Sequence, residues 1–235
     1  MNRDVYGEAL YDYFQTGALS APLLLHNSYG DPEEMPVDVF FREEDDLPEL
    51  EFIALALCDG KILDVGAGVG THTLYLQEKK QDVTAIDISP IACNIMQERG
   101  VQNVLHANIL EWKDQRYDTL LFLMNGIGLA ETVEGFRALL AHCKSLLTEK
   151  GQLIFDSSDI SYLYEEYKVP RPTHYFGEIE YQYEYKMHKG APFKWLYLDQ
   201  RTLIRIAHEE NWVVQILFED DTDQYLVRME PKSQN

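Results

Sequence analysis

A glycine-rich turn between a buried strand and a helix constrains the fold of this chain more than any other feature. Residues 62–72 read ILDVGAGVGTH: an apolar run, an aspartate and then glycines at every second position. A strand that is apolar throughout is typical of a parallel sheet with both faces covered by helices. Glycines after such a strand let the backbone approach a nucleotide-like ligand closely. The turn therefore predicts a nucleoside-binding α/β domain.

Beyond residue 60 the sequence alternates between short β-rich runs and helical runs, which is typical of a doubly wound α/β sheet. We expect strands at 61–66, 82–88, 103–107, 118–125 and 152–158. Helices are expected at 71–80, from Ser89 and Pro90 to near Gly100, at 134–147 and at 198–211. Two final runs, VVQILFE and QYLVRME, are joined by DDTD and predict a closing antiparallel hairpin.

Two segments break this rhythm. Residues 1–60 carry several tyrosines and an acidic stretch, and they predict a helical, acidic cap in which a helix runs from Pro48 to Cys58. Residues 61–235 are expected to form the main domain. Within it, the alternating run EIEYQYEYKMHK and the following GAPFKWLYLD predict an antiparallel hairpin inserted around 176–199.

The formal net charge of −20, from 40 acidic and 20 basic residues, limits the class of partner. Such a field repels phosphate backbones and anionic lipid, so we expect no nucleic-acid substrate and no membrane-surface role. It would attract an amine-bearing or cationic small molecule. Cys58, Cys93 and Cys143 are widely spaced without a CxxC motif, which favours reduced thiols and predicts no metal site. Without a signal peptide or an apolar run of ~18 residues, the sequence predicts a cytoplasmic protein.

Three kinds of ligand compete for the glycine turn. A phosphate-binding P-loop needs a lysine followed by Ser or Thr after its second glycine, and Thr71-His72 stands there. A dinucleotide site needs GxGxxG, but Thr71 takes the place of the third glycine and Gly70 comes one position early. The spacing is GxGxG. Asp87, at the end of the next expected strand and 21 residues beyond Gly66, suits the ribose hydroxyls of either an NAD or an adenosylmethionine site.

The run ILDVGAGVG resembles the first motif of the class I S-adenosylmethionine-dependent methyltransferases, an apolar run, an acidic residue and then GxGxG. Asn108, in HANIL, stands where members of that family often carry an aspartate that accepts from the adenine amino group, and an amide oxygen also accepts. The closing hairpin fits the family's seven-stranded Rossmann-like sheet, with helices on both faces and the last strand antiparallel. The resemblance implies a cofactor site formed by Asp64, Gly66, Ala67, Gly68, Gly70, Asp87, Ile88, Asn108, Ile109 and Asn125.

The resemblance also implies that S-adenosylmethionine donates a methyl group and leaves as S-adenosylhomocysteine. We expect a small-molecule acceptor and an in-line displacement, in which a general base is needed only when the nucleophile starts protonated. Candidates for such a base, or for positioning the acceptor, are His72, Asn125, Asp156 and Tyr11. Tyr11 is expected to share one face of an N-terminal helix with Tyr6 and Tyr13, and this helix would close over the site as a lid. We expect a monomer or a homodimer.

Two other functions stay open on these residues alone. An NAD-dependent oxidoreductase is disfavoured by Thr71 but is compatible with Asp87. A non-catalytic module that binds adenosylmethionine would keep the same turn and the same strand ends. Measurements of cofactor affinity distinguish the first alternative from a methyltransferase, and measurements of turnover distinguish the second.

Overall fold

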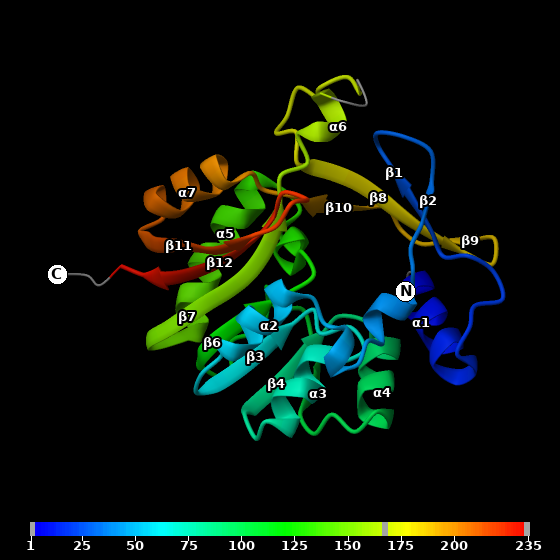
Figure 1. The fold of residues 1–235 in the computed structure, drawn as a ribbon, viewed down its shortest axis with the longest axis horizontal. Helices are drawn as coiled ribbons and strands as arrows, with labels where there is room; N and C mark the ends of the chain where they lie inside the picture. Colours follow the sequence, from blue (N-terminus) through cyan, green and yellow to red (C-terminus); the bar gives the residue numbers. More distant parts are fainter. Residues whose placement is uncertain (1–2, 166–168, 233–235) are drawn as a thin grey trace.

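A seven-stranded sheet forms the centre of the protein in the computed structural model, which describes residues 3–165 and 169–232. Its strand order is β11-β12-β7-β6-β3-β4-β5 (Figure 1). The parallel strands are β3 (Lys61–Val65), β4 (Asp82–Asp87), β5 (Val104–His106), β6 (Tyr117–Phe122) and β7 (Leu147–Ser158). β12 (Gln224–Pro231) is antiparallel to β7 and to β11 (Trp212–Glu219). The predicted doubly wound sheet and its antiparallel closing hairpin are therefore confirmed.

Helices cover both faces of this large sheet (Figure 1). One face carries α2 (Glu49–Ala56), α3 (Thr71–Glu78) and α4 (Pro90–Glu98), and the other carries α5 (Val133–Leu146) and α7 (Gln200–Glu209). Along β6, Leu120 and Phe122 pack with residues of α5 and α7, whereas Leu121 packs with residues of α2 and α3. Because successive side chains of a strand point to opposite faces, a strand buried on both sides reads as a continuous apolar run.

Two expected strand limits are corrected by the structure. The strand expected at 118–125 ends at Phe122, because Met124 and Asn125 adopt left-handed backbone conformations with φ of 59° and 54°. The strand expected at 152–158 begins at Leu147, immediately after α5. The predicted start of α4 is confirmed, since the Ser89 hydroxyl accepts from the backbone N–H of Ala92 and caps the helix.

A second, smaller sheet lies beside the large one (Figure 1). Its members are β1 (Leu24–Asn27), β2 (Glu33–Glu34), β8 (Glu178–Tyr185), β9 (His188–Lys189) and β10 (Phe193–Leu196). β8 and β10 pair antiparallel, as the alternating sequence predicts. The N-terminal segment, expected to be a helical and acidic cap, also supplies β1, which pairs with β8. The sequence did not indicate this strand because it is too short to show a periodic pattern and forms only by pairing with a distant segment.

We call α1 (Val5–Thr16) and the small sheet together the lid. The lid reaches the strand ends of the large sheet at two places (Figure 1). Ser89, which follows β4, donates from its hydroxyl to the Asp4 carboxylate at the start of α1. Asn125, which follows β6, donates from its side chain to the backbone carbonyl of Leu196 in β10 at 3.2 Å. The lid therefore lies over the carboxyl edge of the large sheet.

Short helical segments occupy several connections. They are η1 (Asp38–Phe40), η2 (Glu44–Asp46), η3 (Gly126–Ala130) and α6 (Tyr162–Glu165). Within the ranges 3–165 and 169–232, no helix has both the length and the apolar composition that crossing a membrane requires.

A close approach between η3 and the lid depends on a glycine. The Trp195 side chain of β10 lies so near Gly128 that a Cβ atom there would stand 2.1 Å from the Trp195 Nε1 atom. Only a residue without a side chain lets the indole pack at this distance. Gly128 thus allows the inserted hairpin to rest on the loop that follows β6.

We predict that Gly128→Ala destabilises the protein by about 1–3 kcal/mol, because the methyl group would overlap the indole of a packed tryptophan. Urea unfolding followed by tryptophan fluorescence measures the change. Gly30→Ala is the matched control, because a Cβ atom there would meet only the Asn27 Oδ1 atom, at 3.8 Å. Equal stability of the two variants would show that Trp195 does not depend on this contact.

Candidate functional site

The glycine turn after β3 leaves its backbone bare on one side. Gly66, Gly68 and Gly70 all have positive φ, of 68°, 56° and 84°. A Cβ atom at Gly66 or Gly68 would meet nothing within 4 Å, whereas one at Gly70 would stand 2.8 Å from the Val101 side chain. The first two glycines therefore leave space beside the backbone, while Gly70 lets the start of α3 approach Met96 of α4 and Val101 closely. Gly66 and Ala67 both donate their backbone N–H groups to the Ile86 carbonyl, which fixes the turn against β4.

Asp87, at the end of β4, joins the turn to the start of α4. Its Oδ2 atom accepts from the Gly68 backbone N–H at 2.8 Å, and its Oδ1 atom accepts from the Ser89 backbone N–H at 2.8 Å. Burial raises the pKa of Asp87 to about 6, although the two N–H groups act in the opposite direction. Each carboxylate oxygen has further acceptor capacity after these bonds. The neighbouring Ile88 side chain is 68% exposed and offers an apolar surface beside the carboxylate.

The residues after β5 use their polar groups within the protein. The Asn108 side-chain oxygen accepts from the Leu110 backbone N–H at 3.0 Å and so closes the turn that follows the strand. Ile109 is buried in the core on the α5 face, and its carbonyl accepts from His142. The predicted contact of Asn108 with the adenine amino group and the predicted place of Ile109 in the cofactor site therefore stay predictions.

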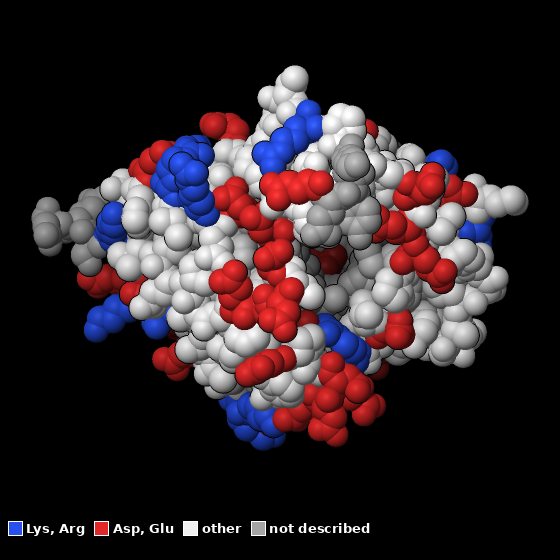
Figure 2. Space-filling view, turned by 45° about the horizontal axis from the view of Figure 1, so that its top comes forward, with Lys and Arg blue, Asp and Glu red and all other residues white. Residues whose placement is uncertain are grey.

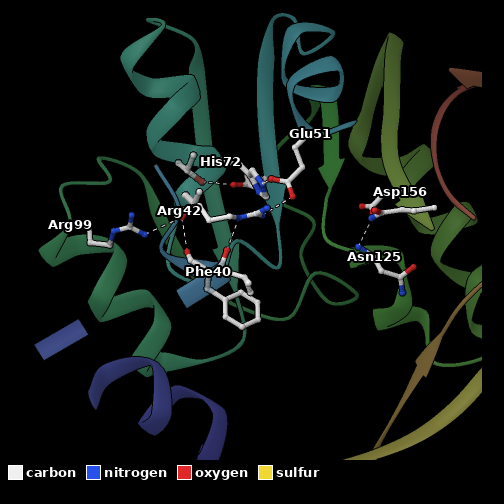
Figure 3. A network of polar contacts seen from close by, with 12 residues as sticks. Phe40, Arg42, Glu51, His72, Arg99, Asn125 and Asp156 are labelled. Atoms are coloured by element: carbon white, nitrogen blue, oxygen red, sulfur yellow. Dashed lines mark hydrogen bonds and ion pairs between the residues drawn. The ribbon is translucent and has the colours of Figure 1, made fainter. Parts of the chain in front are cut away.

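Thr71, which occupies the place of a third dinucleotide glycine, has a structural partner of its own. Its hydroxyl donates to the Phe40 carbonyl at 2.6 Å, and Arg99 donates to the Thr71 hydroxyl at 3.3 Å (Figure 3). The start of α3 is thereby tied to the segment that precedes α2. A glycine at this position would lose both contacts.

His72 belongs to a buried ion network that the sequence did not reveal (Figure 3). Its Nε2 atom lies 2.7 Å from the Glu51 Oε2 atom, and the Arg42 guanidinium donates to the Glu51 Oε1 atom at 2.6 Å. Beside it, the Thr73 hydroxyl donates to the buried Asp64 carboxylate at 2.5 Å. Helical spacing places Glu51 on the same face as two buried residues of α2, and that pattern was the signal available in the sequence.

The charged groups of this network stabilise one another in their ionised forms. Burial alone would lower the pKa of His72, but its hydrogen bond to Glu51 and the negative charges of Asp64 and Glu51 raise it. Burial likewise would raise the pKa of Glu51, but His72 and Arg42 lower it. His72 is therefore stabilised as a cation, and this favours a supporting role over that of a free general base.

Asn125 and Asp156 stand side by side at the ends of adjacent strands, β6 and β7 (Figure 3). The Asp156 Oδ2 atom accepts from the Asn125 backbone N–H and from the Gln224 side chain, both at 2.8 Å. Both residues are buried, and in the described part of the chain the Asp156 Oδ1 and Asn125 Oδ1 atoms have no hydrogen-bond partner. Burial raises the pKa of Asp156 to about 6.

Tyr11 is separated from these groups. It is 41% exposed and lines an open groove of about 810 Å³ between α1 and α4, with Asn94 and Lys186 among its neighbours. Tyr6 faces inward instead, stacks on Tyr183 with ring centroids 5.1 Å apart and meets Phe40 edge-on. Five residues along a helix turn the side chain through well over a quarter-turn, so Tyr6 and Tyr11 do not share a face.

Comparisons with known proteins agree with this geometry. Residues 62–151 match the family model of a methyltransferase domain. A methyltransferase from Bacteroides fragilis, solved with S-adenosyl-L-homocysteine, is 36% identical with a TM-score of 0.90, over 98% of this chain and 95% of that one. An uncharacterized methyltransferase from Staphylococcus carnosus is 29% identical over 147 residues. The matched stretch covers 61% of this chain and 66% of the relative. The CcbJ methyltransferase from Streptomyces caelestis shares the fold, with a TM-score of 0.64 at 11% identity over 97% of this chain and 98% of that one.

The sheet order, the GxGxG turn and the acidic end of β4 define an α/β methyltransferase of class I. The chain belongs to the S-adenosylmethionine-dependent methyltransferases.

We predict that Asp156→Asn stabilises the protein against urea, by up to about 3 kcal/mol at pH 8. The raised pKa means that the folded protein favours the neutral carboxyl, so ionisation costs stability as the pH rises from 3.8, the ordinary value, through about 6. The gain should therefore be about 1 kcal/mol smaller at pH 5 than at pH 8. Because Oδ2 accepts both hydrogen bonds, an amide oxygen in its place keeps them.

Asp82→Asn, at an exposed position where β4 begins, removes the same charge and is the control. A loss of stability in Asp156→Asn at both pH values would contradict the raised pKa.

Proposed function

We propose that this protein transfers a methyl group from S-adenosylmethionine to a small-molecule acceptor by in-line displacement. The observation that carries the proposal is the bare turn at Gly66 and Gly68 beside the Asp87 carboxylate, in a chain of this family. The turn lies where the strand order changes direction, between β3 and its neighbours β4 and β6. Ligands of open α/β sheets bind at such a point, outside the carboxyl ends of the strands.

The residues present fit the methyl donor. The open side of Gly66 and Gly68 leaves room for its amino-acid and ribose portions next to backbone. The remaining acceptor capacity of Asp87 suits two ribose hydroxyls, and the exposed Ile88 side chain suits one face of an adenine ring. Asp64, Ala67, Gly70, Asn108, Ile109 and Asn125 complete the proposed site. The bound donor supplies an electrophilic methyl group on a positively charged sulfur.

Features of the lid favour a small-molecule acceptor. Figure 2 shows a hollow between the large sheet and the lid, with acidic side chains around it and in its depth. Aromatic side chains of the lid pack on one another beside the strand ends, and Phe193 stacks on Tyr183 with ring centroids 5.2 Å apart. With a net charge of −20, the surface disfavours nucleic acid as the acceptor.

Alignment accounts for most of the catalysis in this proposal. Holding two reactants in an attack geometry can supply roughly 7–11 kcal/mol of the barrier. The lid would exclude water and hold the acceptor against the strand ends of β6 and β7. Residues 1–60 and the hairpin around 176–199 would act together as the cover of the domain that spans 61–235. The three buried, free cysteines suit the reducing cytoplasm.

We expect Asp87→Ala to weaken S-adenosylhomocysteine binding by on the order of 1–3 kcal/mol, because the hydroxyls lose their charged acceptor. Isothermal titration calorimetry measures the affinity, and a urea curve shows whether the variant folds without its bonds to Gly68 and Ser89. Asp82→Ala, which removes an exposed carboxylate at the opposite edge of the sheet, is the control.

Unchanged affinity in a folded Asp87→Ala variant would refute the ribose contact. Binding of NADH in preference to S-adenosylhomocysteine would instead favour the oxidoreductase. Tight cofactor binding without turnover on any acceptor would favour a non-catalytic module.

A further inference from the structure

Two buried side-chain oxygens stand without partners at the edge of the proposed site. They are the Oδ1 atoms of Asp156 and Asn125, and none of the residues described contacts either by a hydrogen bond. Burying such an oxygen without a partner destabilises the folded protein. A ligand that donates hydrogen bonds would offset that loss of stability, so the pair marks a place where donor groups bind.

The backbone turn that carries Asn125 has an unusual conformation. Met124 and Asn125 both have positive φ without being glycine, and the Asp156 carboxylate accepts from the Asn125 N–H at this turn. Such conformations are uncommon for residues other than glycine, although asparagine tolerates them better than methionine, and they cluster at functional sites. A Cβ atom at Gly126 would lie 3.8 Å from the Val65 carbonyl, so this turn lies directly beside the end of β3. The unpartnered oxygens are therefore next to the strand that carries the methyl-donor turn.

The groups around Asp156 favour a positively charged ligand. Within residues 3–165 and 169–232, Asp156 forms no ion pair. The Leu198 backbone N–H donates to the Ser157 hydroxyl at 3.0 Å, which brings Tyr197, just after β10, close to the strand position of Asp156. The Tyr197 hydroxyl lies 3.3 Å from that of Tyr181. Aromatic rings beside an unpaired carboxylate form a favourable surface for a cation.

We propose that the acceptor is a small amine, whose nitrogen binds at the unpartnered Oδ1 atom of Asp156, on the side of the site that Asn125 borders. This proposal rests on the methyltransferase function proposed above and names its substrate class. The unpaired Asp156 carboxylate accepts hydrogen bonds and attracts positive charge. An ammonium group supplies both a donated hydrogen and the charge, whereas an alcohol or a thiol supplies only the hydrogen.

The proposed methyl transfer balances in atoms and charge with the amine, the methyl donor and Asp156. The ammonium form gives one proton to the Asp156 carboxylate and becomes a neutral amine. The nitrogen lone pair then forms a bond to the methyl carbon as the carbon–sulfur bond breaks, and that bond's electron pair stays on sulfur. The methylated nitrogen carries the positive charge that sulfur loses, and Asp156 returns its proton to solvent when the product leaves.

The test uses matched amines and alcohols with the full-length protein loaded with S-adenosylhomocysteine. The pairs are cyclohexylamine with cyclohexanol, 2-phenylethylamine with 2-phenylethanol, and glucosamine with glucose. Saturation-transfer NMR measures binding, and mass spectrometry with S-adenosylmethionine measures methyl transfer. We expect binding and transfer for the amine of at least one pair, with its alcohol bound at least about 10-fold more weakly.

Asp156→Asn sharpens the test because it changes one atom. The amide oxygen takes the place of Oδ2 and keeps the bonds from Asn125 and Gln224, so an NH₂ group replaces the unpartnered Oδ1 and turns an acceptor into a donor. Amine affinity should fall on the order of 10- to 100-fold while S-adenosylhomocysteine affinity is unchanged. Asn125→Gly, which keeps the left-handed backbone and removes the amide oxygen, should lower it several-fold. Asp82→Asn should leave it unchanged.

Three results would overturn the proposal. The alcohols could bind as tightly as their amines, none of the three amines could bind to the loaded protein, or Asp156→Asn could leave amine affinity unchanged. Each of these results counts only when the protein has S-adenosylhomocysteine bound. A failure to bind S-adenosylhomocysteine would count against the proposed function itself and is seen in the calorimetric titration alone.

Discussion

The hydrogen bond from the Gly68 backbone N–H to the Asp87 carboxylate joins the two elements on which the site depends. It holds the turn after β3 against the end of β4, and the second carboxylate oxygen holds the start of α4. The turn can then keep its positive φ angles and leave one side of its backbone bare. Together with the bonds from Gly66 and Ala67 to the Ile86 carbonyl, this bond opposes the conformational freedom of a glycine-rich segment.

Buried carboxylates gather around the same crevice and oppose stability. Asp64, Asp87 and Asp156 each have a raised pKa, with burial as the largest cause. Protein interiors disfavour such charges unless they are paired, so their presence at three strand ends is a cost of the fold. Glu51 differs, because Arg42 and His72 neutralise it and lower its pKa. A methyl donor with a positive sulfur and an amine acceptor are the ligands that would relieve a field of this sign.

Much of the large sheet could be predicted from the sequence because local patterns determine it. The apolar run before Gly66 and the cap at Ser89 act over a few residues, and the structure keeps both. The alternating run at 178–189 likewise predicted β8 and its pairing with β10. The donor turn was recognised by spacing alone, since the positions of its glycines decide which ligands fit.

The remaining parts of the site depend on contacts between distant segments. Glu51 lies in an acidic stretch that suggests solvent exposure, and its burial follows from Arg42 and His72, which stand 9 and 21 residues away in the chain. β1 forms because β8, more than 150 residues later, offers it an edge. Helical spacing alone separates Tyr6 from Tyr11, but only the packing of α1 decides that Tyr6 is the one that faces inward. Local patterns carry no information about such pairings.

The lid and the strand ends are mechanically coupled through one side chain. Asn125 receives its backbone conformation partly from Asp156, in the large sheet, and donates its side chain to Leu196, in the lid. The indole of the neighbouring Trp195 rests on Gly128, three residues beyond Asn125. The position of the inserted hairpin and the direction of the Asn125 oxygen are therefore set together. In this arrangement the donor side is fixed by the rigid turn and Asp87, while the acceptor side is shaped by a segment that can vary in length and sequence without disturbing the turn.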